Sequence, residues 1–323
     1  MPGRNPIKKQ TLPNMLRKQV STKLRVAFLC LVLAVPVPVP FWAPAAANAQ
    51  TASVGQVSQA AGVQEFLDLW KRQGRELRDI RRGAAVPRIF IDTLPDDLPE
   101  VEAGSLRKAA FIKILLPILL DINEQVLADR ELLLYLAARH RAGVALDRGE
   151  RRWLEHLAAE YGVGPRDFDA LIARVDVVPP SLALAQGAEE SGWGTSRFAR
   201  HGNAVYGQRT WQKGAGMVPV RRDADASHEV RTFGSLQDSV YRYVLNLNTH
   251  PAYEEFREER ARVRAESEAV TGGVLAATLL SYSERGEDYV ATLEKIIDGN
   301  RLEDFDDARL ARERSARLFG TVK

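Results

Sequence analysis

The sequence contains one cysteine, Cys30, among its 323 residues. A single thiol excludes a disulfide within the chain, and it excludes zinc sites that need several thiolates. The five histidines form no i, i+4 pair and no histidine–carboxylate motif of the zinc-hydrolase kind. A G-x-S-x-G nucleophile motif and a complete phosphate-binding loop are also missing. We therefore expect no metal, no cofactor and no serine triad.

Acidic residues are missing from positions 1–49, where seven lysines and arginines occur. The apolar run from Val26 to Val35 is about ten residues long, whereas a bilayer core needs about 20. Small residues at Ala47-Asn48-Ala49 complete the order of a secretory signal peptide. We expect an exported protein of the periplasm or cell envelope, with no stable membrane span after cleavage. An uncleaved anchor or a disordered basic tail is the alternative.

The positive balance of the chain comes from this same segment. The whole chain has 45 basic and 42 acidic residues, and its formal net charge is +3. Without residues 1–49 it has 38 basic and 42 acidic residues, which is a net charge of −4. Arginine-rich stretches at 78–82 and 148–152 lie on polar faces of predicted helices, where solvated charge is common. We therefore expect no nucleic-acid partner.

Apolar periodicity predicts a mostly helical chain with a small β region, an α+β fold. Between Tyr206 and Phe233, glycines separate short apolar stretches that predict two small strands, at 217–220 and 228–233. Residues 86–91 resemble a short strand or an extended segment. Helical patterns cover residues 63–82, 105–137 with a kink at Pro117, 148–161, 167–172, 181–191, 236–247, 272–282 and 287–297.

The segment from Ala185 to Ser196, AQGAEESGWGTS, has the most chemical content. A predicted helix of small residues ends there in Glu189 and Glu190, and a Gly-Trp-Gly turn follows. A carboxylic acid beside a tryptophan is a plausible general acid, because partial burial raises its pKa. Glycines permit close approach of a polymer, and Trp193 can stack on a sugar ring. A solvated glutamate at an ordinary helix C-terminus is the alternative.

This segment and its continuation, AQGAEESGWGTSRFARHGNAVYGQ, resemble the signature of glucosaminidase-domain peptidoglycan hydrolases, glycoside hydrolase family 73, and especially the Bax-type proteins. VLNLNTHPAYEEFR at Val244–Arg257 adds to the resemblance, which covers roughly 170–298. Val86–Pro99 and Ser105–Arg130 also look like the Bax-type N-terminal region. The resemblance implies a lysozyme-like domain with a small β lobe flanking a substrate groove. It also implies cleavage of the β-1,4 bond between N-acetylglucosamine and N-acetylmuramic acid in peptidoglycan glycan strands.

The resemblance implies that Glu190, directly before Ser-Gly-Trp-Gly, is the general acid. Adjacent helical residues point about 100° apart, so Glu189 is expected to be a surface or supporting carboxylate. The family's second carboxylate lies in the β lobe, where Glu229 is the best match and Asp223 and Asp225 are runners-up. A charge at a solvent-facing strand position is the alternative interpretation of Glu229.

The remaining site residues are also implied by the resemblance. Tyr289 matches a tyrosine that hydrogen-bonds the sugar or positions water, and a half-buried helix tyrosine is the alternative. The candidates for substrate contact are Trp193, Asn203, Tyr206 and Tyr282. The substrate's own 2-acetamido group can act as an internal nucleophile, so inversion and retention both stay open.

These observations divide the chain into five parts: a signal peptide (1–49), a linker with a short amphipathic helix (50–84), an N-terminal helical region (85–165), a glucosaminidase domain (166–300) and a charged C-terminal tail (301–323). Two other functions stay open. One is a non-catalytic peptidoglycan-binding or scaffold protein. The other is a lytic transglycosylase, which also uses a Glu followed by Ser but commonly shows Gly-Leu-Met-Gln where this chain has none.

Overall fold

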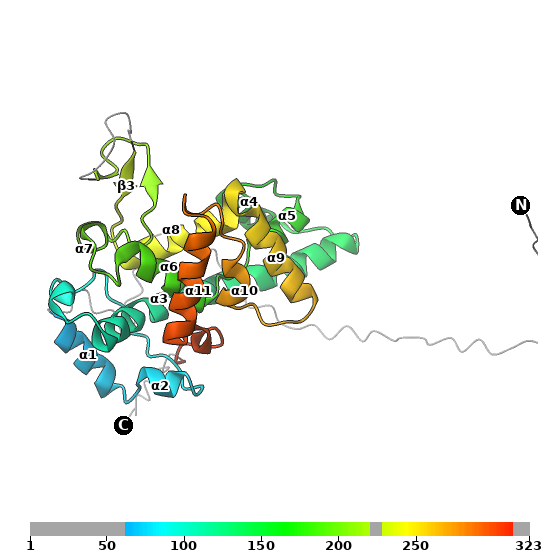
Figure 1. Ribbon diagram of the computed structural model, residues 1–323. Helices are drawn as coiled ribbons and strands as arrows, with labels where there is room; N and C mark the ends of the chain where they lie inside the picture. The colour runs from blue at the N-terminus through cyan, green and yellow to red at the C-terminus, as the bar shows by residue number, and fades with distance from the viewer. Residues whose placement is uncertain (1–61, 220–227, 313–323) are drawn as a thin grey trace, which may run out of the picture. The chain divides into compact units, whose positions relative to one another are not determined.

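The longest element is α3, the 37-residue helix Ser105–Arg141. Every residue from Ala110 to Leu120 is buried, as expected for a helix that is apolar on all sides. Pro117 removes one backbone N–H from the helix, which nevertheless continues as a single element. The structure is a computed structural model that describes residues 62–219 and 228–312 (Figure 1).

A second buried helix, α6 (Pro180–Ser191), packs against α3 and ends in the predicted site. Its small residues permit this close contact, since a Cβ at Gly187 would lie 3.2 Å from Val205 Cγ1 and 3.4 Å from Leu115 Cδ1. Two helices and one 3-10 turn also contact α6, so it is enclosed along its length (Figure 1). These elements are α10 (Gly272–Ala276), α11 (Glu287–Asn300) and η3 (Leu302–Phe305).

The remaining helical elements are α1 (Val63–Arg72), α2 (Leu77–Ile80), η1 (Leu98–Glu100), α4 (Arg148–Glu160), α5 (Phe168–Arg174), α7 (Arg197–Gly202), α8 (Leu236–Thr249), η2 (Pro251–Tyr253) and α9 (Glu254–Ala265). Most of the predicted helices are confirmed to within a few residues, whereas α7 and α9 were not predicted. The single helix predicted for 63–82 is wrong, because the chain breaks at Gly74 (φ 64°) into α1 and α2. The predicted helix 272–282 is too long, since α10 ends at Ala276. The hydroxyl of Thr278 donates to the Leu275 carbonyl at 2.8 Å and competes with the helical backbone bond.

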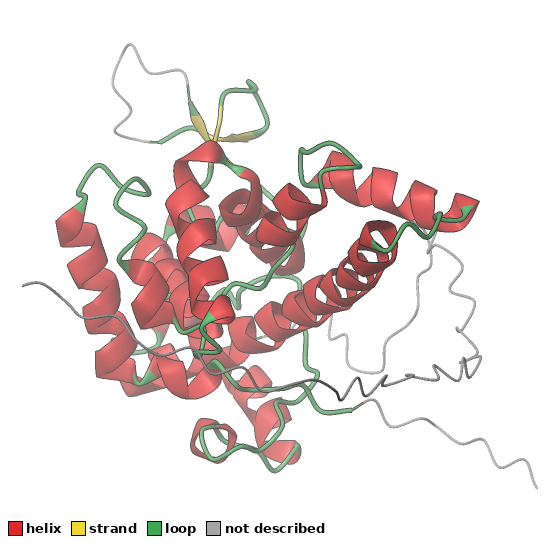
Figure 2. Cartoon of the chain, turned by 90° about the vertical axis from the view of Figure 1, so that its right-hand side faces the viewer, coloured by secondary structure: helices red, strands yellow, loops and turns green. Residues whose placement is uncertain are grey.

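The β lobe is a three-stranded antiparallel sheet in the order β1 (Arg209–Thr210), β3 (Glu229–Arg231), β2 (Gly216–Met217). Val230 in the central strand pairs with Arg209 on one side and Met217 on the other. The strand β1 was not predicted, and the end of the predicted strand 217–220 lies outside the described residues. The small sheet lies at the edge of the helical part of the molecule, next to α7, which confirms the α+β class (Figure 2).

The segments before α3 and after α11 lie together. Val86 forms an isolated parallel bridge with Leu310, so the predicted strand 86–91 is an extended segment with isolated bridge residues and not a continuous strand. Leu302 and Phe305 are fully buried, so the described beginning of the predicted charged tail packs against the helices, whereas Arg301, Glu303 and Asp304 are exposed. The proposed boundary between residues 165 and 166 stays a prediction, and residues on both sides of it share one hydrophobic core.

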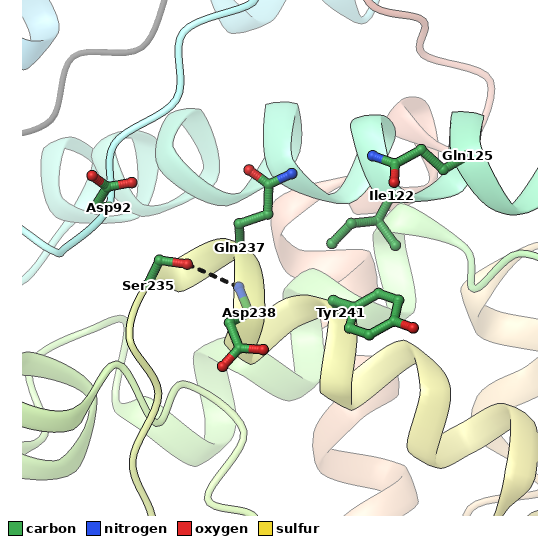
Figure 3. A pocket seen from close by; sticks show the side chains of 7 residues that line it. All are labelled: Asp92, Ile122, Gln125, Ser235, Gln237, Asp238 and Tyr241. Atoms are coloured by element: carbon green, nitrogen blue, oxygen red, sulfur yellow. Dashed lines mark hydrogen bonds between the residues drawn. The ribbon is translucent and has the colours of Figure 1, made fainter. Parts of the chain in front are cut away.

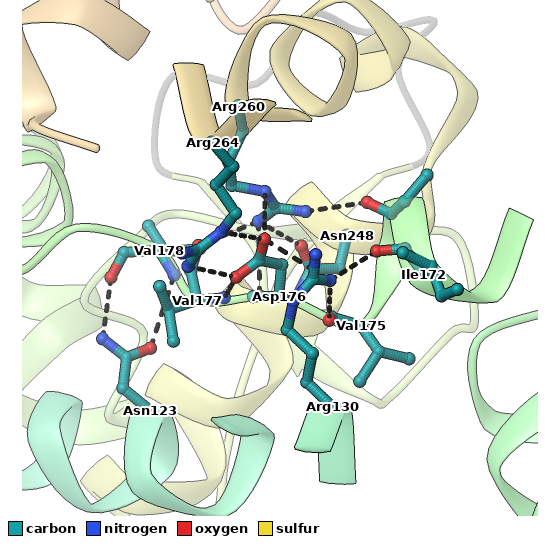
Figure 4. Close-up of polar contacts among 11 residues, drawn as sticks. Asn123, Arg130, Ile172, Val175, Asp176, Val177, Val178, Asn248, Arg260 and Arg264 are labelled. Atoms are coloured by element: carbon teal, nitrogen blue, oxygen red, sulfur yellow. Dashed lines mark hydrogen bonds and ion pairs between the residues drawn. The ribbon is translucent and has the colours of Figure 1, made fainter. Parts of the chain in front are cut away.

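An ion cluster around Asp176 fixes the connection that enters α6 (Figure 4). The Asp176 side chain is 3% exposed and accepts hydrogen bonds from Arg264 Nε and Nη2, each at 2.6 Å. Arg130 of α3 and Arg260 of α9 lie 3.5 and 3.8 Å from the same carboxylate. Arg260 also donates to the carbonyls of Ala173, Asp176 and Val177. The Asp176 carboxylate, in the connection between α5 and α6, thereby joins α3 to α9.

The predicted signal peptide (1–49), residues 50–61 of the predicted linker, Asp223, Asp225 and residues 313–323 lie outside the described residues. Across 62–219 and 228–312, no helix combines the length and the apolar character that crossing a bilayer requires.

Candidate active site

The chain leaves α6 through three consecutive residues with left-handed backbone: Gly192 (φ 59°), Trp193 (φ 59°) and Gly194 (φ 83°). Tryptophan adopts this conformation only at a cost, so the turn needs support from its surroundings. Ser191 supplies part of it, since its hydroxyl donates to the Gly187 carbonyl and accepts from the Gly194 N–H at 2.8 Å. The Glu-Ser-Gly-Trp-Gly sequence therefore builds a bonded turn directly after Glu190.

Trp193 is half-buried and faces α3. Its ring makes an edge-to-face contact with Phe111 at 5.6 Å, and Lys108 Nζ lies 5.0 Å from the ring centroid. The next residue must be glycine, because a Cβ at Gly194 would lie 2.8 Å from Leu98 Cδ2. The turn is thus packed onto the N-terminal region. Sugar stacking by Trp193 stays a prediction.

Glu190 is half-buried, and its pKa is raised above the usual value. Burial is the largest cause of the shift, and the neighbouring Glu189 carboxylate adds to it. A hydrogen bond with Tyr289 and the positive charges of Arg285 and Arg209 act in the opposite direction. A raised pKa favours the protonated form of the carboxyl group, and this is the form that can donate a proton to a substrate.

Gly207 forms one wall beside this carboxyl group. Its φ is +60°, and a Cβ there would lie 3.4 Å from Glu190 Oε2. The position therefore favours glycine for its backbone conformation, and a side chain here would contact the predicted acid.

The two adjacent glutamates have different surroundings, as the helical geometry predicts. Glu189 forms an ion pair with Arg285 at 2.6 Å, and Arg285 also donates to Thr292 Oγ1 at 2.7 Å. Arg285 lies in the segment before α11 and is half exposed, so this pair is accessible to solvent. The pair is consistent with a supporting role for Glu189.

Buried tyrosines surround the inner side of Glu190. Tyr289 is 1% exposed and is therefore not the half-buried helix tyrosine of the alternative interpretation. Tyr282 stacks on Tyr289 with ring centroids 5.4 Å apart, and its hydroxyl donates to the Tyr206 carbonyl at 3.3 Å. Tyr206 in turn stacks on Tyr243 at 3.7 Å. The structure thus places three predicted site tyrosines in one cluster with Glu190.

Two of the predicted substrate contacts are buried. Tyr206 is 2% exposed, and Asn203 is 6% exposed. Asn203 ends α7 in a left-handed conformation and donates through Nδ2 to the Phe233 carbonyl at 3.2 Å. Substrate contact by these residues stays a prediction, and it requires their small exposed fractions to face the sugar.

Glu229 is 7% exposed on β3, so the alternative of a solvent-facing strand charge is wrong. Its carboxylate accepts the Gly214 N–H at 3.0 Å and the Gly216 N–H at 2.9 Å. The backbone of β2 comes very close to β3 here, since a Cβ at Gly216 would lie 2.2 Å from the Val230 carbonyl oxygen and 3.0 Å from Glu229 Cβ, so the position requires glycine. Glu229 therefore holds the β1–β2 turn, and its role as second carboxylate stays a prediction.

Gln186, Tyr243 and Arg285 were not among the predicted site residues, whereas Gly207 was part of the family signature without an assigned role. A signal for Gln186 was available, because it precedes Glu190 by four residues and i, i+4 residues share a helix face. Tyr243 and Arg285 lie far from the motif in sequence, and no local pattern indicates their contacts with it.

A separate cavity of about 280 Å³ lies between α3, α8 and the segment containing Asp92 (Figure 3). None of the predicted site residues lines it. Its lining residues are Asp92, Ile122, Gln125, Ser235, Gln237, Asp238 and Tyr241. Within the part of the chain that the structure describes, no three or more histidine, cysteine or acidic side chains are grouped so as to hold a metal ion.

Comparison with known proteins relates this site to one family. Residues 166–302 match the glucosaminidase family, described as mannosyl-glycoprotein endo-beta-N-acetylglucosaminidase. The chain is 34% identical to protein bax of Escherichia coli (strain K12) over 203 residues, which are 61% of this chain and 70% of that protein. A solved structure, the catalytic domain of the autolysin Auto from Listeria monocytogenes, is 16% identical, with a TM-score of 0.32 over 53% of this chain and 96% of that one. The family match and the similarity to the bax protein show that this chain belongs to the Bax-type glucosaminidase-domain proteins.

Proposed function

We propose that this protein is an exported glycoside hydrolase that cleaves the β-1,4 bond between N-acetylglucosamine and N-acetylmuramic acid in peptidoglycan. The observation that carries the proposal is Glu190, a half-buried carboxyl group with a raised pKa at the end of α6, in a glucosaminidase-family chain. The glucosaminidase domain is proposed to span 166–300, and the region 85–165 is proposed to brace it through α3.

Cleavage of a glycosidic bond requires a proton on the leaving oxygen and stabilisation of an oxocarbenium-like centre. Glu190 is proposed to supply the proton. Glu229 or the substrate's 2-acetamido group is proposed to provide the second function, and Tyr289 to hydrogen-bond the sugar or position water. Trp193, Asn203, Tyr206 and Tyr282 are proposed to contact the glycan.

The substitution Glu190→Gln tests the proposal, because it keeps the shape of the side chain and removes the transferable proton. We expect clearing of purified sacculi to fall at least about 100-fold, the usual contribution of a general acid. Glu189→Gln is the matched control, since it changes an adjacent glutamate that is paired with Arg285, and it should keep most of the activity. Full activity of Glu190→Gln would contradict the proposal.

One observation favours a second candidate. The carboxylate of Glu229 already accepts backbone N–H groups of the β lobe, and Glu189 is paired with Arg285. Among the described candidate carboxylates, this leaves Glu190 as the one without an ion pair or backbone N–H donor, and a single catalytic carboxyl group suits a lytic transglycosylase. Mass spectrometry of the released fragments distinguishes the functions: reducing ends indicate a hydrolase, and anhydro-muramic ends indicate a transglycosylase. Binding to sacculi without any release indicates a non-catalytic binding protein.

A further inference from the structure

Three buried polar side chains form a chain of hydrogen bonds that ends at Glu190. Gln186 lies on α6, one helical turn before Glu190, and is fully buried. The Tyr243 hydroxyl of α8 donates to Gln186 Oε1 at 2.7 Å. Gln186 Nε2 donates to the Tyr289 hydroxyl of α11 at 3.0 Å. The Tyr289 hydroxyl also lies close enough to the carboxyl group of Glu190 to lower its pKa as a hydrogen-bond donor.

With the Gln186 amide oriented as it is in the structure, the donors and acceptors in this chain follow one order. A tyrosine has one hydroxyl proton, and an amide has a carbonyl acceptor at one end and an NH₂ donor at the other. Because the proton of Tyr243 is directed to Oε1, the amide of Gln186 presents Nε2 to Tyr289. Tyr289 therefore accepts from Gln186, and its own proton is left for Glu190.

We propose that Gln186 is a positioning residue, oriented by Tyr243, that directs the hydroxyl proton of Tyr289 toward Glu190. The inference rests on the proposed role of Glu190 as general acid. When Glu190 transfers its proton to the leaving oxygen, Tyr289 keeps its own proton and donates a hydrogen bond to the new carboxylate. This donor is already aligned before the reaction, so no group has to reorient as the negative charge develops.

Burial makes the order of the bonds consequential. Both ends of the Gln186 amide have a partner, as a fully buried amide requires. The Tyr289 bond favours the ionised form of Glu190 and so limits the rise in its pKa that burial causes. The other titratable or charged groups that act on Glu190 or are coupled to it are Glu189, Arg285, Arg209, Tyr243, Tyr253 and Tyr282.

The test is an NMR titration of Glu190 in the full chain labelled with carboxyl-13C glutamate, assigned by the signal that Glu190→Gln removes. Tyr289→Phe should raise the pKa of Glu190 by about one unit, because the carboxylate loses its donor. Tyr243→Phe keeps the ring and frees the amide to turn Oε1 toward Tyr289. This variant and Gln186→Met should each raise the pKa by about half a unit. The matched control is Tyr161→Phe, which changes a buried tyrosine at the C-cap of α4 and should leave the pKa of Glu190 unchanged.

The decisive result is the double variant. Tyr243→Phe/Tyr289→Phe should titrate like Tyr289→Phe alone, since Tyr243 and Gln186 act through the Tyr289 proton. The proposal is overturned if Tyr243→Phe shifts the pKa of Glu190 by the same amount with and without the Tyr289 hydroxyl. It is also overturned if neither Gln186→Met nor Tyr243→Phe shifts this pKa. Tyr243→Phe provides the test if Gln186→Met does not fold.

The titration needs no catalytic activity, so it separates this inference from the proposed function. If Glu190→Gln is fully active while the pKa shifts are found, the positioning role of Gln186 stands and the role of Glu190 as general acid fails. If both stand, the basic limb of kcat/KM should move upward with the measured pKa of Glu190 in each variant.

Discussion

Replacing Asp176 by asparagine should destabilise the protein strongly, although the side chain is far from any proposed chemistry in sequence. The carboxylate is 3% exposed, and Arg260 beside it is 1% exposed. Asparagine keeps the size of the side chain and removes its charge. Arg260, Arg130 and Arg264 would then lie together without the negative charge that they share.

Removal of one partner from a buried ion pair usually costs about 3–5 kcal/mol. Arg260 would keep hydrogen bonds to backbone carbonyls and to Asn248 Oδ1, and Arg264 is 34% exposed and can be hydrated. These contacts reduce the loss, so we expect about 3 kcal/mol, the lower end of that range.

The pH dependence provides an independent check. Burial works to raise the pKa of Asp176, but the positive charges of Arg260, Arg264 and Arg130 outweigh it and hold the pKa below the usual 3.8. Because the pKa of Asp176 is lower in the folded protein, the unfolded chain binds the Asp176 proton more tightly. The ionised carboxylate therefore stabilises the fold above about pH 4, and this stabilisation is lost as the pH falls through the lowered pKa. Asp176→Asn should remove this part of the acid dependence.

Urea unfolding followed by far-UV circular dichroism measures both effects. The matched control is Asp169→Asn, since Asp169 pairs with Arg141 at the surface with 89% and 61% of the side chains exposed. This control should cost less than about 1 kcal/mol. A loss below about 1 kcal/mol for Asp176→Asn at pH 7 would refute the reasoning, because the cluster would then contribute no more than a surface pair.

Two further predictions concern the site. Arg285→Gln removes a positive charge that lowers the pKa of Glu190, and it leaves Glu189 without its ion pair. The basic limb of the pH–activity profile should therefore move to higher pH, by more at low salt than at high salt. A shift to lower pH would contradict this. Gly207→Ala places a Cβ 3.4 Å from Glu190 Oε2 at φ +60°, whereas Gly143→Ala, at φ +77° with open space around it, introduces backbone strain alone. Both should lose about 1 kcal/mol of stability, but only Gly207→Ala should lower kcat/KM, and equal activities would count against the proposed acid.

The sequence predicted the helices that depend on local pattern. The apolar repeat of α3, the acidic caps of α4 and α5, and the proline at the start of α6 all lie within a few residues of the positions they determine. The helix α9 was not predicted, because its sequence EEFREERARVRA is mostly charged. Its buried arginines, Arg257 and Arg260, point inward because distant carbonyls and carboxylates receive them.

The site likewise contains features that follow from the local sequence and features that depend on residues distant in the sequence. The turn after Glu190 is a local structure, since Gly192, Gly194 and the Ser191 hydroxyl lie within four residues of the acid. The orientation of Glu229 into the β lobe depends on Gly214 and Gly216, which are 15 and 13 residues away. A strand pattern places a side chain on one face, but it does not say whether a neighbouring turn covers that face.

By itself, the sequence determined most of the helical elements, the glutamate at the end of α6 and the family signature, because each depends on residues that are close along the chain. Only the tertiary structure decided what surrounds that glutamate. Gln186 meets Tyr243 and Tyr289 across 57 and 103 residues, and Glu189 meets Arg285 across 96. Such contacts form when α3, α10 and α11 enclose α6. The same packing buries the Glu190 carboxyl group and excludes water from it, and this burial raises its pKa.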